Sequence, residues 1–416
     1  MQPAGRIDVQ DWMQAPATRA VMGALAAEGA RALFVGGCVR NTLLGRPADD
    51  IDIATEATPQ EAMRLLQQAG IKVVATGIEH GTVTAVIDGR GLEITTLRRD
   101  AETFGRKARV EFTDDWLQDA GRRDFTFNAL YCDDRGTLYD PFDGRADLER
   151  GVVRFVGSAM QRIAEDYLRA FRFFRFLAWY GRPPADEAAI EAIVFHAPHL
   201  AELSGERVRK EMLRLLAAPD PEPATGLMLR HGVLVHWLPE AESAGGLVPM
   251  LALEKAAGVA PDALRRLLAL LAPDADGEAI AARWRFSRAE QARLVAALRP
   301  APKIAGLDAQ SVRELVYRVG NRTALDRLML HGLRGGAEAG DAALVAALVA
   351  ALRLARDWPA PRFPLAGADV LALGVAPGAE IGWLLGAVEE WWIAGDFAAD
   401  AGACRAELKR TAERRR

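Results

Sequence analysis

Hydrophobic and polar positions divide the chain into two regions with different periodicities. Over residues 20–140, short apolar runs suited to strands alternate with stretches of helical spacing. Almost everything after residue 145 repeats with the period of a helix and contains few β-branched runs. Mixed strands and helices followed by helices alone are typical of two different layer architectures. The pattern therefore predicts a domain boundary near residue 145.

The first region predicts a small sheet with flanking helices. A short apolar run at 32–36 ends in a Gly-Gly pair, and an amphipathic helix is expected over 59–69 after a start signal at Thr58. Further runs rich in Val, Ile and Thr are separated by glycine turns such as Asp88-Gly89. These runs predict strands at 72–76, 82–87 and 92–97.

The segment at 100–109, DAETFGRKAR, has a different character from the strands before it. It carries charges of both signs, a glycine and no apolar period. Polar segments of this kind usually run over the surface of a protein. The sequence therefore predicts a mobile surface loop here.

Composition narrows the class of protein. The 416 residues are 50% hydrophobic and 26% charged, which indicates a globular chain long enough for two or more packed units. A formal net charge of -4 excludes a uniformly basic protein, so any nucleic-acid site has to be a local basic patch. The three cysteines, Cys38, Cys132 and Cys404, are odd in number and widely spaced, which fits a reducing compartment.

The sequence predicts neither a secretory signal nor a membrane-spanning segment. The first residues, MQPAGRIDVQDWMQ, lack the basic and apolar segments of a secretory signal. The longest apolar stretches are too short to span a bilayer. We therefore expect a cytoplasmic protein without a membrane segment.

The first candidate chemistry is a pair of carboxylates in the run ADDIDIAT. Asp50 and Asp52 are two residues apart in an expected strand, so both side chains project from the same face. Two carboxylates this close repel each other unless a cation compensates their charge. Magnesium held by one or two carboxylates plus substrate phosphates is the common arrangement. Glu93, in a later expected strand, is a candidate third carboxylate if its face points the same way. Solvated turn acids remain the alternative.

The residues before this pair suit a phosphate group. Gly36 and Gly37 let backbone N–H groups approach phosphate oxygens closely, and Arg40 lies one helical step further on. This arrangement predicts triphosphate binding. An ordinary strand-to-helix turn with a surface arginine remains the alternative.

Four segments together carry a family resemblance: GGCVRN, DDIDIAT, RRDFTFNAL at 122–130 and EDYLRAFRFFRF at 165–176. In order and spacing they resemble the bacterial-type (class II) tRNA nucleotidyltransferases and their poly(A) polymerase relatives. The resemblance is strong over residues 30–180 and only general beyond. It implies an α+β head with the polymerase-β-type nucleotidyltransferase fold, followed by an all-α neck, body and tail. The corresponding ranges are 1–145, 146–215, 216–300 and 301–416, with the tail expected to contact tRNA.

The resemblance also implies roles for residues of the head. Asp50 and Asp52 would be the magnesium ligands, and Gly37 and Arg40 would contact the triphosphate. Arg123, with Asp124 beside it, would bind the incoming nucleotide and sense its ribose 2′ hydroxyl. Arginine forks well onto phosphate, and a carboxylate can accept a hydrogen bond from a ribose hydroxyl. One departure is Asn41, where the family often has an aspartate after the arginine.

The segment EDYLRAFRFFRFLAWYG predicts one buried helix that is apolar around most of its circumference. Because buried charge is costly unless paired, Asp166 and Arg169, three positions apart, are expected to pair with each other or with a ligand. Arg172 and Arg175 continue this polar edge. In the family resembled here, the aspartate and the first arginine form a protein template for the base edge of CTP or ATP, which implies Asp166 and Arg169.

Arg172 and Arg175 would then support the triphosphate or the pocket. A good pair of hydrogen bonds to a base edge contributes about 1–3 kcal/mol of discrimination. An intrahelical ion pair with the remaining arginines exposed is the alternative.

The function implied is template-independent addition of C, C and A to the 3′ end of tRNA from CTP and ATP, with Mg2+ as cofactor and pyrophosphate as the second product. A poly(A) polymerase, or an enzyme that adds only C or only A, remains open. The segment 100–109 falls where the family's C-to-A switching element lies. A non-catalytic RNA-binding protein on the same fold is the alternative from a different class. The sequence leaves the oligomeric state undefined.

Overall fold

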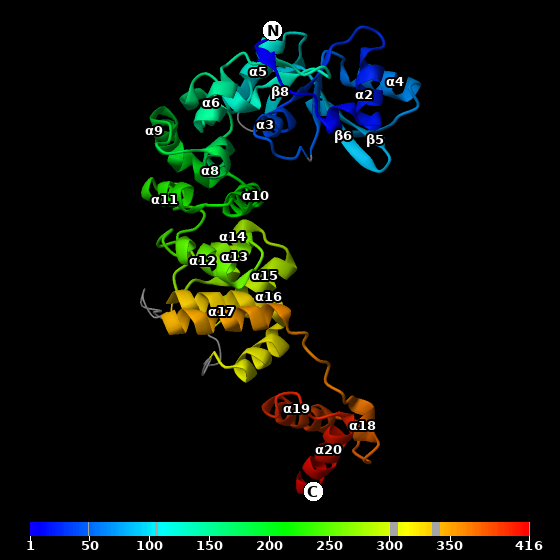
Figure 1. The fold of residues 1–416 in the computed structure, drawn as a ribbon, viewed down its shortest axis with the longest axis vertical. Helices are drawn as coiled ribbons and strands as arrows, with labels where there is room; N and C mark the ends of the chain where they lie inside the picture. Colours follow the sequence, from blue (N-terminus) through cyan, green and yellow to red (C-terminus); the bar gives the residue numbers. More distant parts are fainter. Residues whose placement is uncertain (49, 105–106, 300–306, 335–341, 416) are drawn as a thin grey trace. The chain divides into compact units, whose positions relative to one another are not determined.

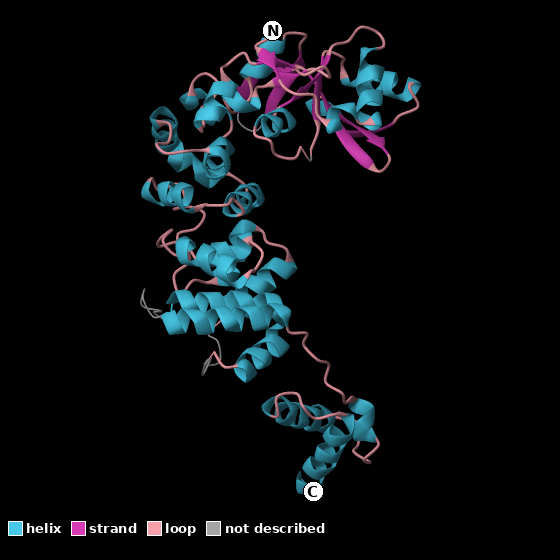
Figure 2. Cartoon of the chain, viewed as in Figure 1, coloured by secondary structure: helices cyan, strands magenta, loops and turns pink. Residues whose placement is uncertain are grey.

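The computed structural model describes residues 1–48, 50–104, 107–299, 307–334 and 342–415 (Figure 1). The chain forms two compact units, Met1–Trp237 and Leu238–Arg416. All described strands lie in the first unit, and the last of them ends at Tyr139 (Figure 2). The predicted α+β head followed by helices is therefore confirmed. None of the helices in these ranges is long and apolar enough to cross a membrane.

The head contains a mixed eight-stranded sheet in the order β1-β10-β9-β2-β3-β6-β5-β4. The pair β3 and β6 is parallel, and the other neighbouring pairs are antiparallel. The strands are β1 (Gly5–Arg6), β2 (Ala32–Val35), β3 (Asp52–Thr55), β4 (Lys72–Gly77), β5 (Thr82–Ile87), β6 (Arg90–Thr96), β9 (Tyr131–Cys132) and β10 (Thr137–Tyr139). The predicted strands at 72–76, 82–87 and 92–97 correspond to β4, β5 and β6.

Local sequence signals explain several of these elements. The turn between β5 and β6 has positive φ at both Asp88 (50°) and Gly89 (75°), as a tight two-residue hairpin turn requires. Helix α4 (Pro59–Gln68) begins after Thr58, whose side chain forms a capping box with Glu61. The predicted helix start is therefore confirmed.

Residues 100–109 were predicted to be a loop, and this prediction is wrong. The chain instead forms a second, two-stranded antiparallel sheet from β7 (Arg98–Phe104) and β8 (Lys107–Phe112). Arg98 pairs with Phe112, and Arg99 pairs with Glu111, to which it also forms an ion pair of 2.9 Å. Backbone hydrogen bonds and cross-strand charge pairs hold such a hairpin without the apolar alternation that sequence reasoning looks for. Residues 105–106 lie outside the described residues.

Helices pack on the sheet, and side chains from helices and strands together form the apolar core. Helix α2 (Pro16–Ala26) contacts β2 and α4, and α4 contacts β4, β5 and β6 (Figure 1). A buried cluster around the central strands includes Leu33, Val35, Leu97, Trp116 and Tyr131. The cluster also includes Ala54 of β3, and α4 packs on β6, so both strands that carry predicted carboxylates are held by packed neighbours.

The remaining helices of the first unit follow in chain order. They are α1 (Asp11–Gln14), α3 (Gly37–Leu43), α5 (Trp116–Gly121), α6 (Gly144–Arg150), α7 (Ala159–Glu165), α8 (Leu168–Tyr180), α9 (Glu187–His196), α10 (Gly205–Leu216) and α11 (Glu222–Arg230). Short 3-10 turns are η1 (Ile78–His80), η2 (Thr126–Asn128) and η3 (Ala197–Glu202).

The segment predicted as one helix from residue 165 is divided into α7 and α8. Asp166 has extended backbone angles (φ -152°, ψ 104°), and its Oδ1 accepts a hydrogen bond of 3.1 Å from the N–H of Leu168. Aspartate competes for backbone donors in this way at helix starts, which explains the break. The predicted burial of α8 is confirmed for Phe171, Phe173, Phe174 and Phe176.

The second unit is helical in its described parts. Its helices are α12 (Leu247–Ala257), α13 (Ala263–Leu268), α14 (Gly277–Trp284), α15 (Arg288–Leu298), α16 (Ala309–Arg334), α17 (Ala342–Asp357), α18 (Gly367–Leu371), α19 (Ala379–Ala394) and α20 (Ala401–Arg415). One apolar core joins α12, α16 and α17, and another joins α18, α19 and α20. Gly320, with φ 78°, interrupts the helical geometry of α16.

Candidate active site

Two of the predicted carboxylates lie on neighbouring strands of the head. Asp52 is the first residue of β3, and its partner in the parallel pairing is Glu93 of β6. Residues in register on adjacent strands project from the same face. The condition set for Glu93, that its face point the same way as that of Asp52, is therefore met. Asp50 lies before β3 rather than within it, and it is exposed.

The electrostatics of Asp52 reflect this crowding. Burial, followed by the negative charge of Glu93 and a smaller contribution from Asp50, raises the pKa of Asp52 to about 6. Arg123 and Arg40 oppose this rise. A carboxylate surrounded by other carboxylates and by arginines is placed where positive charge is needed to keep it ionised.

This donor set fits a hard divalent cation. Carboxylate oxygens are the ligands that Mg2+ prefers, and one or two of them suffice when substrate phosphates complete the coordination. The described residues contain no group of three or more His, Cys, Asp or Glu side chains gathered around one point. Glu93 as a third metal-site carboxylate therefore stays a prediction.

The glycine pair turns the chain from β2 into α3. Gly36 has φ 70° and ψ -115°, a conformation that side-chain-bearing residues rarely adopt. A Cβ at this position would lie 3.7 Å from Nη1 of Arg123, and one at Gly37 would lie 3.9 Å from Nη2 of Arg40. The N–H of Gly36 already donates to the carbonyl of Leu130 at 3.1 Å, so the turn lies beside two of the predicted nucleotide-binding arginines with this donor engaged.

Arg40 is almost fully buried, with 8% of its surface exposed. Its Nη1 donates to Oδ1 of Asn128 at 2.6 Å, its Nη2 donates to Oδ1 of Asn41 at 3.1 Å, and its Nε is buried without a hydrogen-bond partner. The guanidinium carbon lies 4.5 Å from the ring centre of Tyr180. Among the described residues no carboxylate forms an ion pair with Arg40. Burial accordingly lowers its pKa, because a buried cation without an ion-pair partner is costly, and the nearby Tyr180 and Asp124 offset only part of this effect.

Arg123 is held by a buried carboxylate that the sequence reasoning missed. Asp119 of α5, with a side chain 1% exposed, accepts hydrogen bonds from Nη2 of Arg123 at 3.1 Å and from the hydroxyl of Tyr131 at 2.7 Å. Its other oxygen accepts from Arg122 at 2.7 Å. Burial raises the pKa of Asp119, but the charges of Arg123 and Arg122 outweigh it and lower the pKa to about 2.

Asp124 is saturated with donors. Its Oδ1 accepts from the N–H of Phe125 and from Nδ2 of Asn128, each at 2.9 Å. Its Oδ2 accepts from Nε of Arg172 at 2.7 Å and also from Nη2 of Arg172. A carboxylate offers about four acceptor positions. For Asp124 to contact a ribose hydroxyl, one of these donors has to give way.

Two of the three predicted arginines of α8 contact the segment at 122–124, and the third contacts α10. Arg169 donates from Nη2 to the carbonyl of Arg122 at 3.0 Å, and Arg172 pairs with Asp124. Arg175 forms an ion pair of 2.5 Å with the buried Glu211 of α10. The spacing of three positions keeps these side chains on one edge of the helix. The predicted polar edge is confirmed.

The expected pairing of Asp166 with Arg169 is not observed. Arg169 forms an ion pair of 2.6 Å with Glu165, whereas Oδ2 of Asp166 accepts from Nη2 of Arg207 at 2.8 Å. The break between α7 and α8 moves Asp166 off the helix that carries Arg169, so the three-residue spacing no longer brings the two together. The side chain of Asp166 is 36% exposed and keeps acceptor capacity for a ligand.

Five residues that support the site were not among the predicted residues of the nucleotide site, although Arg207 is one of several arginines that could contact an RNA backbone. They are Asp119, Asn128, Glu165, Arg207 and Glu211. Two of them, Asn128 and Glu165, lie inside the segments RRDFTFNAL and EDYLRAFRFFRF and could have been selected there. The spacing ERVRKE in α10 signals a charged helix face, but it does not indicate which partner each side chain takes.

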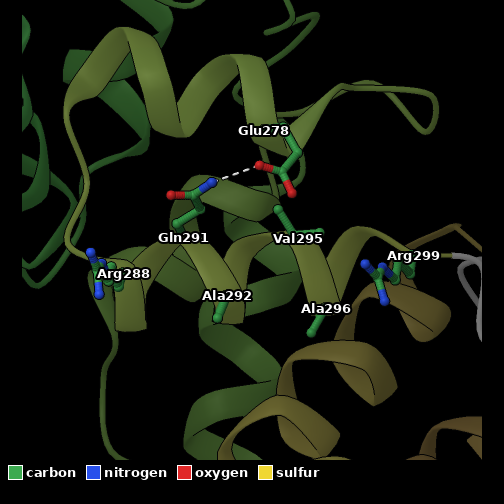
Figure 3. Close-up of a pocket in the computed structure, with 7 residues that line it drawn as sticks. All are labelled: Glu278, Arg288, Gln291, Ala292, Val295, Ala296 and Arg299. Atoms are coloured by element: carbon green, nitrogen blue, oxygen red, sulfur yellow. Dashed lines mark hydrogen bonds between the residues drawn. The ribbon is translucent and has the colours of Figure 1, made fainter.

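Two surface hollows are lined by residues other than the predicted ones. One, of about 480 Å³, is lined by Trp12, Ile51, Arg90 and Leu92 among others, and so includes chain neighbours of Asp50, Asp52 and Glu93. Another, of about 370 Å³ in the second unit, is lined by Glu278, Arg288, Gln291 and Arg299, with a hydrogen bond of 2.6 Å from Gln291 to Glu278 (Figure 3). None of the predicted site residues lines either hollow.

The head fold and its site define a class. A carboxylate at the start of a central strand, a glycine turn and a set of arginines beside it are typical of enzymes that transfer nucleotidyl or phosphoryl groups. Family models agree: residues 32–154 match the "Poly A polymerase head domain", and residues 186–244 match the "Probable RNA and SrmB-binding site of polymerase A".

Relatives narrow this class to a family. The chain is 35% identical over 387 residues to the mitochondrial CCA tRNA nucleotidyltransferase 1 of Danio rerio, covering 86% of this chain and 82% of the relative. It is 41% identical over 210 residues to the CCA-adding enzyme of Geobacillus kaustophilus, about half of each chain. A crystal structure of the Bacillus stearothermophilus CCA-adding enzyme with CTP superposes with a TM-score of 0.74 at 26% identity, covering 98% and 99% of the two chains. The chain therefore belongs to the CCA tRNA nucleotidyltransferase family, as the motif resemblance predicted.

Proposed function

We propose that this protein adds C, C and A to the 3′ end of tRNA, using CTP and ATP and releasing pyrophosphate. The observation that carries the proposal is the pairing of Asp52 with Glu93 on neighbouring strands, together with the buried Arg40, whose Nε lacks a hydrogen-bond partner and which forms no ion pair with a carboxylate among the described residues. Arg40 provides the counter-charge for a bound triphosphate, and Asp52 lies within its electrostatic reach. Family membership supplies tRNA as the acceptor.

Asp50 and Asp52 would hold Mg2+, with Glu93 beside them. When bound, the ion would favour ionisation of the RNA 3′ hydroxyl and neutralise charge on the triphosphate. Asp52 must be ionised for this task, and the charges of Arg123 and Arg40 favour its ionised form. Arg40 and Arg123 orient the triphosphate and stabilise the negative charge that develops on the leaving pyrophosphate.

Nucleotide choice is assigned to the α8 region. Asp166 keeps free acceptor positions beside Arg207, so its carboxylate can accept hydrogen bonds from the amino group of cytosine or adenine. Arg169 contributes by holding the backbone of the segment at 122–124, and it reaches a base edge only if it leaves Glu165. Arg172 and Arg175, each paired with an acid, support this region.

The domain organisation belongs to the same proposal. We infer a head at 1–145, a neck at 146–215, a body at 216–300 and a tail at 301–416 that contacts tRNA. We also infer a cytoplasmic location. The relative from Danio rerio carries the word mitochondrial in its name, so imaging of a tagged full-length chain in its own cell tests this location directly.

Extension assays on defined tRNA test the proposal. The protein is incubated with Mg2+ and tRNA transcripts ending at the discriminator base, with CTP and ATP supplied singly and together, and the products are sequenced. We expect two C residues with CTP alone and a complete CCA end with both nucleotides. Long A tails would identify a poly(A) polymerase instead. Absence of any extension would favour a non-catalytic RNA-binding protein.

A further inference from the structure

The side chain of Asn128 lies between two residues of the proposed nucleotide site. Its Oδ1 accepts a hydrogen bond of 2.6 Å from Nη1 of Arg40, and its Nδ2 donates one of 2.9 Å to Oδ1 of Asp124. Asn128 ends the turn η2 and is 7% exposed. It therefore connects α3, which carries Arg40, with the segment at 122–124.

The polarity of this connection is fixed by its partners. A guanidinium has only donors and an ionised carboxylate has only acceptors, so the carboxamide satisfies both in a single orientation. Asp124 in turn pairs with Arg172 of α8. The four side chains Arg40, Asn128, Asp124 and Arg172 thus form a continuous chain of hydrogen bonds from α3 to α8.

An amide suits this position better than a carboxylate. A neutral oxygen orients the guanidinium of Arg40 without cancelling its charge, which stays available for an anionic ligand. A carboxylate at residue 128 would pair with Arg40 and compete with a triphosphate. It would also place a second negative charge against Asp124.

We propose that Asn128 is a positioning residue that couples triphosphate binding at Arg40 to nucleotide selection at Asp124 and Arg172. This inference rests on the proposed function, because it takes these residues as parts of one nucleotide site. When Arg40 shifts onto the phosphates, Asn128 transmits the shift to Asp124. A nucleotide whose triphosphate contacts Arg40 is thereby bound more tightly at Asp124 and Arg172.

Steady-state kinetics of Asn128→Asp and Asn128→Ala give the first test. We expect Asn128→Asp to raise the KM for both CTP and ATP by about tenfold or more, and Asn128→Ala to raise it less. Thr126→Ala is the matched control, because Thr126 lies in the same turn and its hydroxyl bonds Asp147 at 2.8 Å, outside the chain of four side chains. The control is expected to lower the thermal unfolding midpoint while leaving both KM values unchanged.

A double-mutant cycle tests the coupling itself. Arg40→Lys and Asp124→Asn are made singly and together, once with Asn128 present and once in the Asn128→Ala background. With Asn128, we expect the combined effect on the KM for CTP to differ from the product of the single effects by about tenfold. In the Asn128→Ala background the effects should multiply. This cycle carries the test if Asn128→Asp fails to fold.

Two results would overturn the inference. One is an equal departure from multiplicative behaviour with and without Asn128. The other is a pair of Asn128 variants with the KM values of the unmodified enzyme. Failure of the unmodified protein to add C or A to tRNA would instead overturn the proposed function, so the two failures are distinguishable.

Discussion

Arg207 of α10 donates a hydrogen bond of 2.8 Å to Asp166, the residue at the break between α7 and α8. The two residues are 41 positions apart in the sequence, and both side chains are partly exposed. Asp166 is the residue to which the family resemblance assigns the base edge. Its orientation is therefore set from α10 and not by Arg169, its neighbour in sequence.

Replacing Arg207 should disturb nucleotide choice more than the rate of transfer. In Arg207→Ala the carboxylate of Asp166 loses a charged partner and samples more rotamers. We expect the preference for CTP over UTP, measured as a ratio of kcat/KM values, to fall about tenfold. Lys210→Ala, which removes an exposed cation from the same helix, is the control. Equal preference ratios in Arg207→Ala and the control would contradict the orienting role.

Glu211 is expected to contribute strongly to stability. It is 4% exposed, and it forms ion pairs with Arg175 at 2.5 Å and with Arg172 at 3.8 Å. Removing one partner of a buried pair leaves an uncompensated charge and costs about 3–5 kcal/mol. Glu211→Ala should therefore lower the free energy of unfolding in urea by about that amount. The exposed Glu206 of the same helix provides the control Glu206→Ala, for which a change below about 0.5 kcal/mol is expected.

Acid should destabilise the first unit partly through Asp119. Its pKa is about 2 in the folded protein against an ordinary value of 3.8, so its contribution is present above about pH 4 and is lost as the pH falls toward 2. This difference corresponds to about 2 kcal/mol. Asp119→Asn should be less stable than the parent at pH 6, and the difference should shrink on acidification. Urea unfolding at several pH values measures it, and a constant difference from pH 6 to pH 2.5 would contradict the assignment.

Extension of tRNA should depend on Mg2+. Chelation by EDTA is expected to abolish extension of tRNA, and added Mg2+ should restore it. Asp50→Asn removes a negative charge near Asp52 and should raise the Mg2+ concentration needed for half-maximal activity by about tenfold or more. Asp114→Asn, which changes an aspartate of the same unit with no assigned role, is the control. Unaltered Mg2+ dependence in Asp50→Asn would remove Asp50 from the metal site.

Much of the head could be predicted because its signals are local. The strands β4, β5 and β6, the turn at Asp88 and Gly89 and the cap at Thr58 each depend on a few adjacent residues. Asp52 and Glu93 could be proposed together because strand periodicity assigns a face to each residue. The parallel register that places them side by side is a tertiary property.

The misjudged features depend on long-range partners or on backbone pairing. Arg172 pairs with Asp124, which is 48 positions away in the sequence, and Arg175 pairs with Glu211, which is 36 positions away. Asp166 and Arg169 do not pair because Asp166 has extended backbone angles at the end of α7, where its side chain accepts a hydrogen bond from the N–H of Leu168. The hairpin of β7 and β8 is held by backbone hydrogen bonds, which leave no mark in hydrophobic periodicity. Side-chain spacing alone cannot reveal any of these choices.

In the proposed function, nucleotidyl transfer takes place at Asp52 while Asp166 selects the nucleotide. Single-turnover extension of a tRNA transcript lacking its CCA end, with CTP, ATP and UTP, compares the parent with Asp52→Ala and Asp166→Ala most directly. We expect Asp52→Ala to abolish extension with every nucleotide although the variant still binds tRNA, whereas Asp166→Ala should still extend the tRNA but lose the preference for C and A. Extension by Asp52→Ala at the rate of the parent would contradict the proposed function.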